Sequence, residues 1–187
     1  RTSLIYGNDK MMVIFSTSYD SKYYLYIYTS TNNGSSWAEK RLSKETSLKD
    51  SVCFGNNRFV IAGYHFLASS TDGINWTEIE TSKSYKKVIY GGDRFVAVSG
   101  SCATSTDGIN WQQRGTYADY SDVCYGNGKF IARGYYLYLK VVDYIAQSTN
   151  GSDWEESAFK LNPIDDFGTV GYGNGIFVTT GRADPET

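Results

Sequence analysis

Tyrosines, carboxylates and one histidine supply the residue types in this chain that could recognise a ligand. Nine of them are candidate ligand-binding residues: Tyr19, Tyr23, Tyr64, His65, Tyr117, Tyr135, Tyr136, Asp165 and Asp166. A tyrosine ring can stack on the face of a pyranose, while carboxylates can hold its hydroxyl groups. These residue types predict a carbohydrate-type binding surface. The alternative is that most of the tyrosines are strand residues packed in the interior, because tyrosine is a good strand former.

Catalytic chemistry finds little support in the same residues. His65 is the only histidine, and no serine or cysteine nucleophile context surrounds it. Asp165 and Asp166 are adjacent, as are Glu155 and Glu156. Adjacent strand residues point in opposite directions, so neither pair predicts two cooperating catalytic carboxylates. We predict no catalytic residue, no metal site and no cofactor, and the chain reads as non-enzymatic.

The composition is that of a globular chain rich in strands and turns. Its 187 residues are 41% hydrophobic and 20% charged, with 17 tyrosines, 19 glycines and only two prolines. A net charge of −2 argues against nucleic acid as a partner. No apolar run reaches the roughly 18 residues that a membrane-spanning helix needs. Cys53, Cys102 and Cys124 lack histidine partners at metal-ligand spacing and read as small buried hydrophobic residues.

Two short signatures alternate along the whole chain. The first, which we call the aromatic–Gly pair, occurs at Tyr6-Gly7, Phe54-Gly55, Tyr90-Gly91, Tyr125-Gly126 and Tyr172-Gly173. The second, which we call the Ser–Trp turn, spans Ser30 to Trp37, Ser70 to Trp76, Ser105 to Trp111 and Ser148 to Trp154. Their strict alternation indicates an internal repeat of about 40 residues.

Each repeat reads as four strands. In the second repeat we expect them at residues 51–54, 58–62, 66–71 and 76–79. The run 58–62 is apolar on both faces, which predicts a strand covered on both sides. Asp72 and Gly73 predict a two-residue hairpin turn, because both residue types tolerate a positive φ. Four-stranded units of this length predict an all-β fold, a β-propeller built from antiparallel blades.

The repeat count gives about four and a half blades in a single propeller domain or fragment. We place the blades at about residues 1–45, 46–83, 84–117 and 118–163, with a partial blade at 164–187. A propeller closes on itself to avoid open edges. Three arrangements remain open: part of a larger ring, a five-blade ring closed in an unusual way, or two chains that close each other's edges. An open-edged piece should be prone to self-association.

The Ser–Trp turns resemble the Asp-box (BNR repeat) of sialidase-like and lectin-like propellers. Ser30 to Trp37 follows the Ser-x-Asp-x-Gly-x-Thr-Trp spacing with Asn32 in place of Asp, and the other three copies are one residue shorter. The resemblance implies a fold-stabilising hairpin in which the Asp or Asn accepts backbone N–H bonds and the Trp packs beneath. This role would fall to Asn32, Gly34, Trp37, Asp72, Gly73, Trp76, Asp107, Gly108, Trp111, Asn150, Gly151 and Trp154.

The resemblance also raises the possibility of a sialidase-like hydrolase, which the residues do not favour. Such enzymes use an arginine cluster, a Tyr–Glu nucleophile and an Asp acid/base. Arg58 and Arg94 occupy equivalent repeat positions and read as surface charges of the repeat. The remaining arginines show no family motif, and the Phe-Arg-Ile-Pro type of opening motif is absent. A fragment whose catalytic groups lie on other sequence is therefore the second alternative.

An up-and-down blade, with strands named A to D, alternates its turns between two ends. The A–B turns and the Ser–Trp turns share one end, which we call the turn end. The B–C loops and D–A connections share the other, which we call the variable end. The extra length of the first and fourth repeats falls at the variable end, in residues 16–26, 40–49, 134–144 and 157–169. Because variable loops on a rigid scaffold usually carry binding residues, we expect the site there.

These observations lead to a functional expectation. The chain should be a non-catalytic binding module for a glycan or a cell-surface receptor, as in a secreted lectin, a surface protein or a phage tail component. Its location would be extracellular, cell-surface or virion-associated. The first alternative is a structural or assembly scaffold that binds protein partners.

Overall fold

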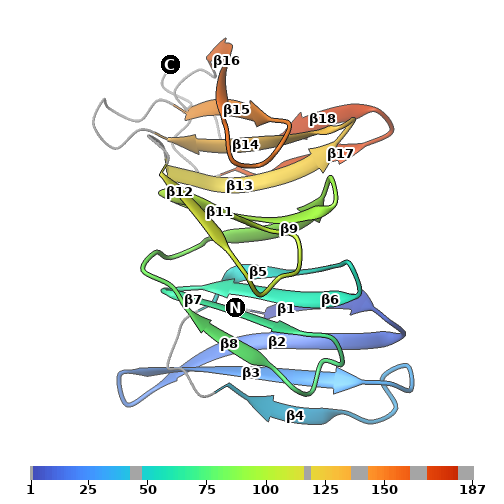
Figure 1. The fold of residues 1–187 in the computed structure, drawn as a ribbon. Helices are drawn as coiled ribbons and strands as arrows, with labels where there is room; N and C mark the ends of the chain where they lie inside the picture. Colours follow the sequence, from blue (N-terminus) through green and yellow to red (C-terminus); the bar gives the residue numbers. More distant parts are fainter. Residues whose placement is uncertain (1, 43–47, 116–118, 136–142, 161–167, 181–187) are drawn as a thin grey trace, which may run out of the picture.

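The structure, a computed structural model, describes residues 2–42, 48–115, 119–135, 143–160 and 168–180 (Figure 1). In these ranges the regular structure is entirely strand. Blade 1 is β1 (Thr2–Gly7), β2 (Lys10–Tyr19), β3 (Lys22–Ser30) and β4 (Ala38–Arg41). Blade 2 is β5 (Leu48–Gly55), β6 (Arg58–Gly63), β7 (Phe66–Ser70) and β8 (Thr77–Glu80). Blade 3 is β9 (Lys87–Gly91), β10 (Arg94–Val98), β11 (Ser101–Ser105) and β12 (Gln112–Gly115).

Blade 4 and a partial blade 5 complete the described fold. Blade 4 is β13 (Asp119–Gly126), β14 (Lys129–Tyr135), β15 (Asp143–Ser148) and β16 (Glu155–Lys160). Blade 5 is β17 (Val170–Gly173) and β18 (Ile176–Thr179). In every blade the strands pair antiparallel in chain order, so each sheet is an up-and-down meander. The all-β, four-stranded organisation expected from the repeat is therefore confirmed.

The blades pack face to face, and the core lies between them (Figure 1). Between blades 1 and 2, Met12, Ile14 and Leu25 meet Phe59 and Phe66. Comparable clusters fill the spaces between blades 2 and 3 and between blades 3 and 4. A strand inside such a stack is covered on both sides, which is why Phe59 to Gly63 and the whole of β7 are buried. Burial on both faces explains the continuous apolar run that the sequence shows there.

The aromatic–Gly pairs join one blade to the next. The A strands β1, β5, β9, β13 and β17 lie side by side in chain order. Each glycine lies beneath the ring of the following blade, so that a Cβ would overlap that ring: Gly7 beneath Phe54, Gly55 beneath Tyr90, Gly91 beneath Tyr125 and Gly126 beneath Tyr172. A glycine is needed at this position because only a bare Cα leaves room for the neighbouring ring.

The two ends of the blades are clearly separated in the structure. In Figure 1 the A–B turns lie toward the right, whereas the B–C turns of blades 1 and 2 lie toward the left. Hydrogen bonds tie the turn end together, because Asn8 Nδ2 donates to the Thr71 carbonyl of the next blade (3.2 Å). Asn56 Nδ2 repeats this contact with the Thr106 carbonyl (3.0 Å).

The Ser–Trp turns differ from the expected two-residue hairpin. In blade 2 the ladder ends at the pair Ser69–Thr77, and the connection runs from Thr71 to Trp76. Gly73 has a positive φ of 75°, whereas Asp72 is not among the residues with positive φ. The prediction of a tight turn was wrong because Asp72 acts through its side chain. Its carboxylate accepts backbone N–H bonds and folds a wider loop around itself.

Candidate functional site

The B–C hairpin of blade 1 presents two of the candidate tyrosines at the variable end. Asp20 and Ser21 form its turn with φ values of 50° and 61°. Tyr19 and Tyr23 flank this turn and are 77% and 51% exposed. Tyr23, Leu25 and Ile27 are alternate residues of β3 and therefore point to the same face of the strand. Leu25 and Ile27 pack against blade 2, so Tyr23 lies on the face toward blade 2. Tyr19 lies on the opposite face of the hairpin, in register with Lys22.

The other tyrosines of this hairpin line the outer face of blade 1. Tyr26 and Tyr28 stack on Phe15, with ring centroids 5.4 and 5.7 Å apart. The Arg41 guanidinium lies over the Tyr24 ring, 5.3 Å from its centroid. These rings are half-buried. Alternate residues of β3 therefore face opposite sides. Leu25 and Ile27 point into the core, whereas the rings of Tyr24, Tyr26 and Tyr28 lie on the outer face.

Blade 2 brings Tyr64 and His65 together at its B–C turn. Their rings meet edge to face, with centroids 4.5 Å apart and planes at 80°. Tyr64 is 56% exposed, whereas His65 is partly buried and adopts a positive φ of 52°. The His65 Nδ1 atom lies 3.2 Å from the Thr81 carbonyl oxygen. A carbonyl oxygen only accepts, so Nδ1 is the donor in this contact.

The D–A connection of blade 2 holds this turn in place. The Thr81 N–H donates to the His65 carbonyl (3.2 Å), and the His65 N–H donates to Ser84 Oγ (3.3 Å). The Tyr85 N–H donates to the Gly63 carbonyl (3.1 Å), just before the turn. The B–C turn and the D–A connection are therefore one hydrogen-bonded unit, which presents Tyr64 outward from a fixed backbone.

The remaining candidate residues divide into two groups. Tyr117, Tyr136, Asp165 and Asp166 lie outside the described residues. Tyr135 ends β14, and its backbone pairs with Asp119 and Asp143. Tyr85 and Tyr120, which also fall near this end in the sequence, are buried in the core. Tyr23, Tyr64 and His65 are thus the candidates that the structure places at the variable end of blades 1 and 2.

The Ser–Trp turns share one hydrogen-bonding pattern at the turn end. In blade 2, Ser70 Oγ accepts from the Gly73 N–H and donates to Asp72 Oδ1. Asp72 Oδ1 also accepts from the N–H groups of Ile74 (2.9 Å) and Asn75 (2.8 Å). Asp107 makes the same bonds in blade 3, and Asn150 Oδ1 makes them in blade 4. In blade 1, Asn32 Oδ1 accepts from the Ser36 N–H (2.9 Å).

The turn carboxylates are strongly held in the ionised form. Desolvation alone would raise the pKa of Asp72, but the bonds from Ile74, Asn75 and Ser70 outweigh it. The pKa of Asp72 therefore lies far below the usual range for a carboxyl group, and Asp107 follows for the same reasons. In blades 1 and 2 the tryptophan closes the loop, since the Trp37 and Trp76 indole N–H groups donate to the Gly34 and Gly73 carbonyls (3.1 Å each).

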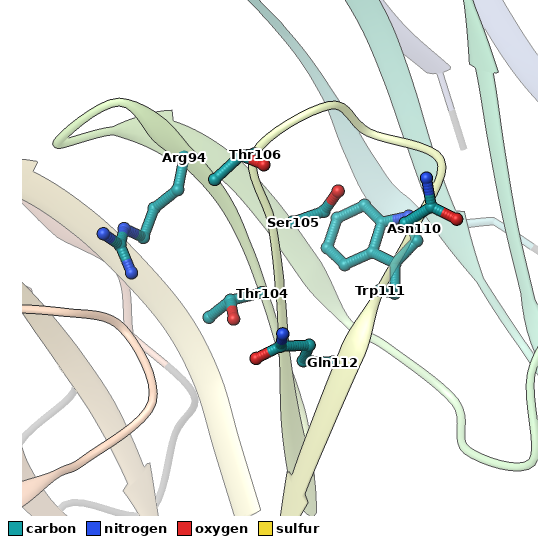
Figure 2. A pocket seen from close by; sticks show the side chains of 7 residues that line it. All are labelled: Arg94, Thr104, Ser105, Thr106, Asn110, Trp111 and Gln112. Atoms are coloured by element: carbon teal, nitrogen blue, oxygen red, sulfur yellow. The ribbon is translucent and has the colours of Figure 1, made fainter.

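Two hollows open at the turn end, in blades 3 and 4. The first, of about 430 Å³, is lined by Arg94, Thr104, Ser105, Thr106, Asn110, Trp111 and Gln112 (Figure 2). The second, of about 360 Å³, is lined by Lys129, Gln147, Ser148, Thr149, Asn150, Asp153 and Glu155. Most lining residues occupy matching repeat positions, such as Arg94 and Lys129 or Gln112 and Glu155. We therefore attribute both hollows to the shape of the repeat.

Charged residues between the A strands form a set that sequence reasoning did not single out. Lys86 Nζ lies 2.7 Å from Asp119 Oδ2, and Lys87 Nζ lies 3.3 Å from Asp122 Oδ1. Asp122 Oδ2 accepts from the Val170 N–H of blade 5 (2.9 Å). Lys87 and Asp122 each stand three residues before the aromatic of their pair. That position could have drawn attention to them, because Ser51 occupies it in blade 2 and bonds to the Val88 backbone of blade 3.

Metal and thiol chemistry have little support in the described residues. In the ranges that the structure covers, no three His, Cys, Asp or Glu side chains group as metal ligands. Burial raises the pKa of Cys53 and of Cys102, and raises that of Cys124 to about 11, so the thiols stay protonated near neutral pH. The described part of the chain also contains no helix long and apolar enough to cross a membrane.

No protein-family model matches this sequence, and no curated protein matches it either. Solved structures match its fold over almost the whole chain. It is similar to the β-propeller domain of the Trilobed protease from Pyrococcus furiosus, with 8% identity, a TM-score of 0.59 and coverage of 99% of this chain and 65% of that one. The chain is a β-propeller.

Two glycoside hydrolases share this propeller architecture. A sialidase from Trypanosoma rangeli matches with 12% identity and a TM-score of 0.57, over 97% of this chain and 44% of that one. An α-L-arabinofuranosidase from Clostridium thermocellum matches with 9% identity and a TM-score of 0.53, over 95% of this chain and 80% of that one. The propeller spans less than half of the sialidase, and likeness at these identities concerns the fold alone.

Proposed function

We propose that this propeller is a non-catalytic binding module that recognises glycans, free or on a cell-surface receptor, through its variable end. The unit of Tyr64 and His65 carries the proposal. More than half of the Tyr64 side chain is exposed, yet the backbone beneath it is fixed by the D–A connection. An aromatic ring held rigid in solvent offers contact area at a low cost in conformational entropy.

The chemistry of the variable end suits a sugar. The exposed face of Tyr64 can stack on a pyranose ring, and His65 Nε2 can accept a hydrogen bond from a hydroxyl group. Tyr23 adds a second ring from blade 1, on the face that looks toward blade 2. Two rings and one acceptor supply the apolar platform and the directional bond that recognition of a neutral sugar requires.

Two of the described carboxylates near this end are engaged in contacts between blades, which favours a binding role over catalysis for them. Asp119 and Asp122 both face lysine ammonium groups, and Asp122 also accepts a backbone N–H bond. Each is therefore used to join blades. Most glycosidases need two carboxyl groups flanking the scissile bond, and a sialidase-like enzyme needs an Asp acid/base beside its Tyr–Glu nucleophile.

The pattern of the Ser–Trp turns supports a finer relationship. Their serine, Asp or Asn and glycine make one recurring set of bonds, in which the glycine N–H donates to the serine Oγ in each of the four turns. We infer that these turns are Asp-boxes and that the chain belongs among the sialidase-like and lectin-like propellers. A glycan target would place the protein outside the cell, on a cell surface or on a virion.

A glycan array probed with the purified chain, with released sugar assayed in the same wells, tests the proposal. Selective binding without sugar release is expected. Tyr64→Ala and Tyr23→Ala should each weaken binding by about tenfold or more, because stacking area is lost. Tyr64→Phe keeps the ring and should bind nearly as well as the wild type. Ile109→Ala, an exposed residue at the turn end, is the matched control. A folded chain that binds no glycan, or one that releases sugar, would overturn the proposal.

A further inference from the structure

Two apolar contacts recur at the interfaces between blades 1 and 2, 2 and 3, and 3 and 4, and the first of them also joins blades 4 and 5. In the first, the aromatic ring of one blade fills the space above the aromatic–Gly glycine of the blade before it. In the second, the Ser–Trp glycine of the later blade packs on a B-strand side chain of the earlier blade. Gly73 packs in this way on Met12, Gly108 on Val60 and Gly151 on Val96. The two contacts run in opposite directions, so each blade gives one side chain and receives one.

The outer face of blade 1 carries an unfilled half of this interface. Tyr6, the aromatic of its pair, is 63% exposed. The neighbour of a Cβ at Gly34, its Ser–Trp glycine, is the ring of Trp37 in the same turn, at 3.7 Å. Gly34 thus lacks the B-strand contact that Gly73, Gly108 and Gly151 make among the described residues.

The outer face of blade 5 carries the other half. Of the atoms that the structure describes, none lies within 4 Å of a Cβ at Gly173. Val178 occupies the position of Met12, Val60 and Val96, and it is 58% exposed. Ile176 stands where the other blades have Lys10, Arg58, Arg94 and Lys129, and it is 61% exposed. Among the described blades, the one with an apolar residue at this position is thus blade 5, whose face toward a following blade is open.

We propose that blade 1 of a second copy of this chain docks on blade 5 of the first. Tyr6 of the second copy fills the space above Gly173, and Val178 of the first packs on Gly34 of the second. Asn174 aligns with Asn8 and Asn56, so its amide faces the Thr31 carbonyl of the second copy, which aligns with Thr71 and Thr106. The interface is heterologous, because the two copies contribute different surfaces.

The contact involves the A and B strands of blade 5 and the A strand and Ser–Trp turn of blade 1. Tyr28 in the C strand of blade 1 stands where the other blades have Ala68, Ala103 and Ala146. It stacks on Phe15, so the C strand keeps a bulky face of its own. The described part of blade 5 has two strands, β17 and β18, so it would cover only part of the face of blade 1.

Sedimentation velocity across a range of protein concentrations tests the proposal through a pair of complementary variants. Tyr6→Ala removes the ring and keeps the glycine surface, whereas Gly173→Val fills the glycine space and keeps the ring. Neither change touches the interior of the copy that carries it, and thermal melting checks that both variants are folded. Each variant alone should associate at least about tenfold more weakly than the wild type.

An equimolar mixture of the two variants is the decisive sample. The intact ring of Gly173→Val meets the intact surface of Tyr6→Ala, so the mixture should form a one-to-one dimer and stop there. Ile74→Ala, an exposed apolar residue on an internal blade, should associate like the wild type. The proposal is overturned if the wild-type chain stays monomeric, as it would if the two faces met within one molecule. It is also overturned if the mixture forms no dimer or if the single variants associate like the wild type.

Discussion

Single residues in the Ser–Trp turns reach the same hydrogen-bonded loop with two different side chains. Blades 2 and 3 use the carboxylates of Asp72 and Asp107, whereas blades 1 and 4 use the amides of Asn32 and Asn150. One oxygen suffices to accept the backbone N–H bonds, so both residue types serve. They differ in charge, which makes the aspartate turns sensitive to acid.

The first prediction concerns this sensitivity. The folded pKa of Asp72 and of Asp107 lies below the unfolded value of about 4, so their ionised forms stabilise the fold above about pH 4. That contribution is lost as the pH falls further. The variant with Asp72→Asn and Asp107→Asn should therefore lose less stability than the wild type between about pH 5 and pH 3, measured by urea unfolding. Asn32→Asp should show the opposite change. Identical pH dependence in all three proteins would contradict this account.

At the level of strands, the aromatic–Gly pairs set how closely two blades can approach. The second prediction is that Gly55→Ala destabilises the fold by about 1–3 kcal/mol, because the added methyl group overlaps the Tyr90 ring. Urea unfolding measures the change. Gly100→Ala is the matched control, since a Cβ there meets no described atom within 4 Å. Equal stability of the two variants would contradict the packing role.

The third prediction concerns the attachment of blade 5. Asp122→Ala removes a buried carboxylate that accepts the Val170 N–H bond and pairs with Lys87. The Val170 residue is buried too. Leaving a buried donor without an acceptor costs about 1–3 kcal/mol. The Val170 amide should then exchange with solvent faster than in the wild type, whereas amides of blade 2 should not change. Glu155→Ala, an exposed carboxylate on β16, should leave Val170 protected.

For the molecule as a whole, the repeat was enough to predict the architecture. Alternating aromatic–Gly pairs and Ser–Trp turns predict four-stranded blades, and the fold agrees. The contacts between blades were not predictable from one repeat, because the need for Gly55 appears only once Tyr90 of the next blade lies above it. The turn around Asp72 was mistaken for a tight hairpin because residue types do not reveal whether the backbone or the carboxylate shapes the loop.

The binding role of the candidate site residues stays a prediction, whereas the structure shows where several of them lie. Tyr23, Tyr64 and His65 lie at the variable end and are accessible, whereas Tyr85 and Tyr120 from the same stretches are buried. Parity along a strand separates inward from outward rings in blade 1. In the connections no such period exists, so neither the burial of Tyr85 nor the hydrogen bond from its N–H to the Gly63 carbonyl could be predicted from the sequence.

The central claim is that ligands bind at the variable end of blades 1 and 2. NMR chemical-shift mapping of the labelled chain, titrated with a glycan selected on the array, tests it most directly. The account predicts that the largest changes fall on Tyr23, Tyr64 and His65 and their neighbours in the Thr81 to Tyr85 connection. Changes centred instead on Arg94, Trp111 and Gln112 would place the site in the turn-end hollow and contradict the account.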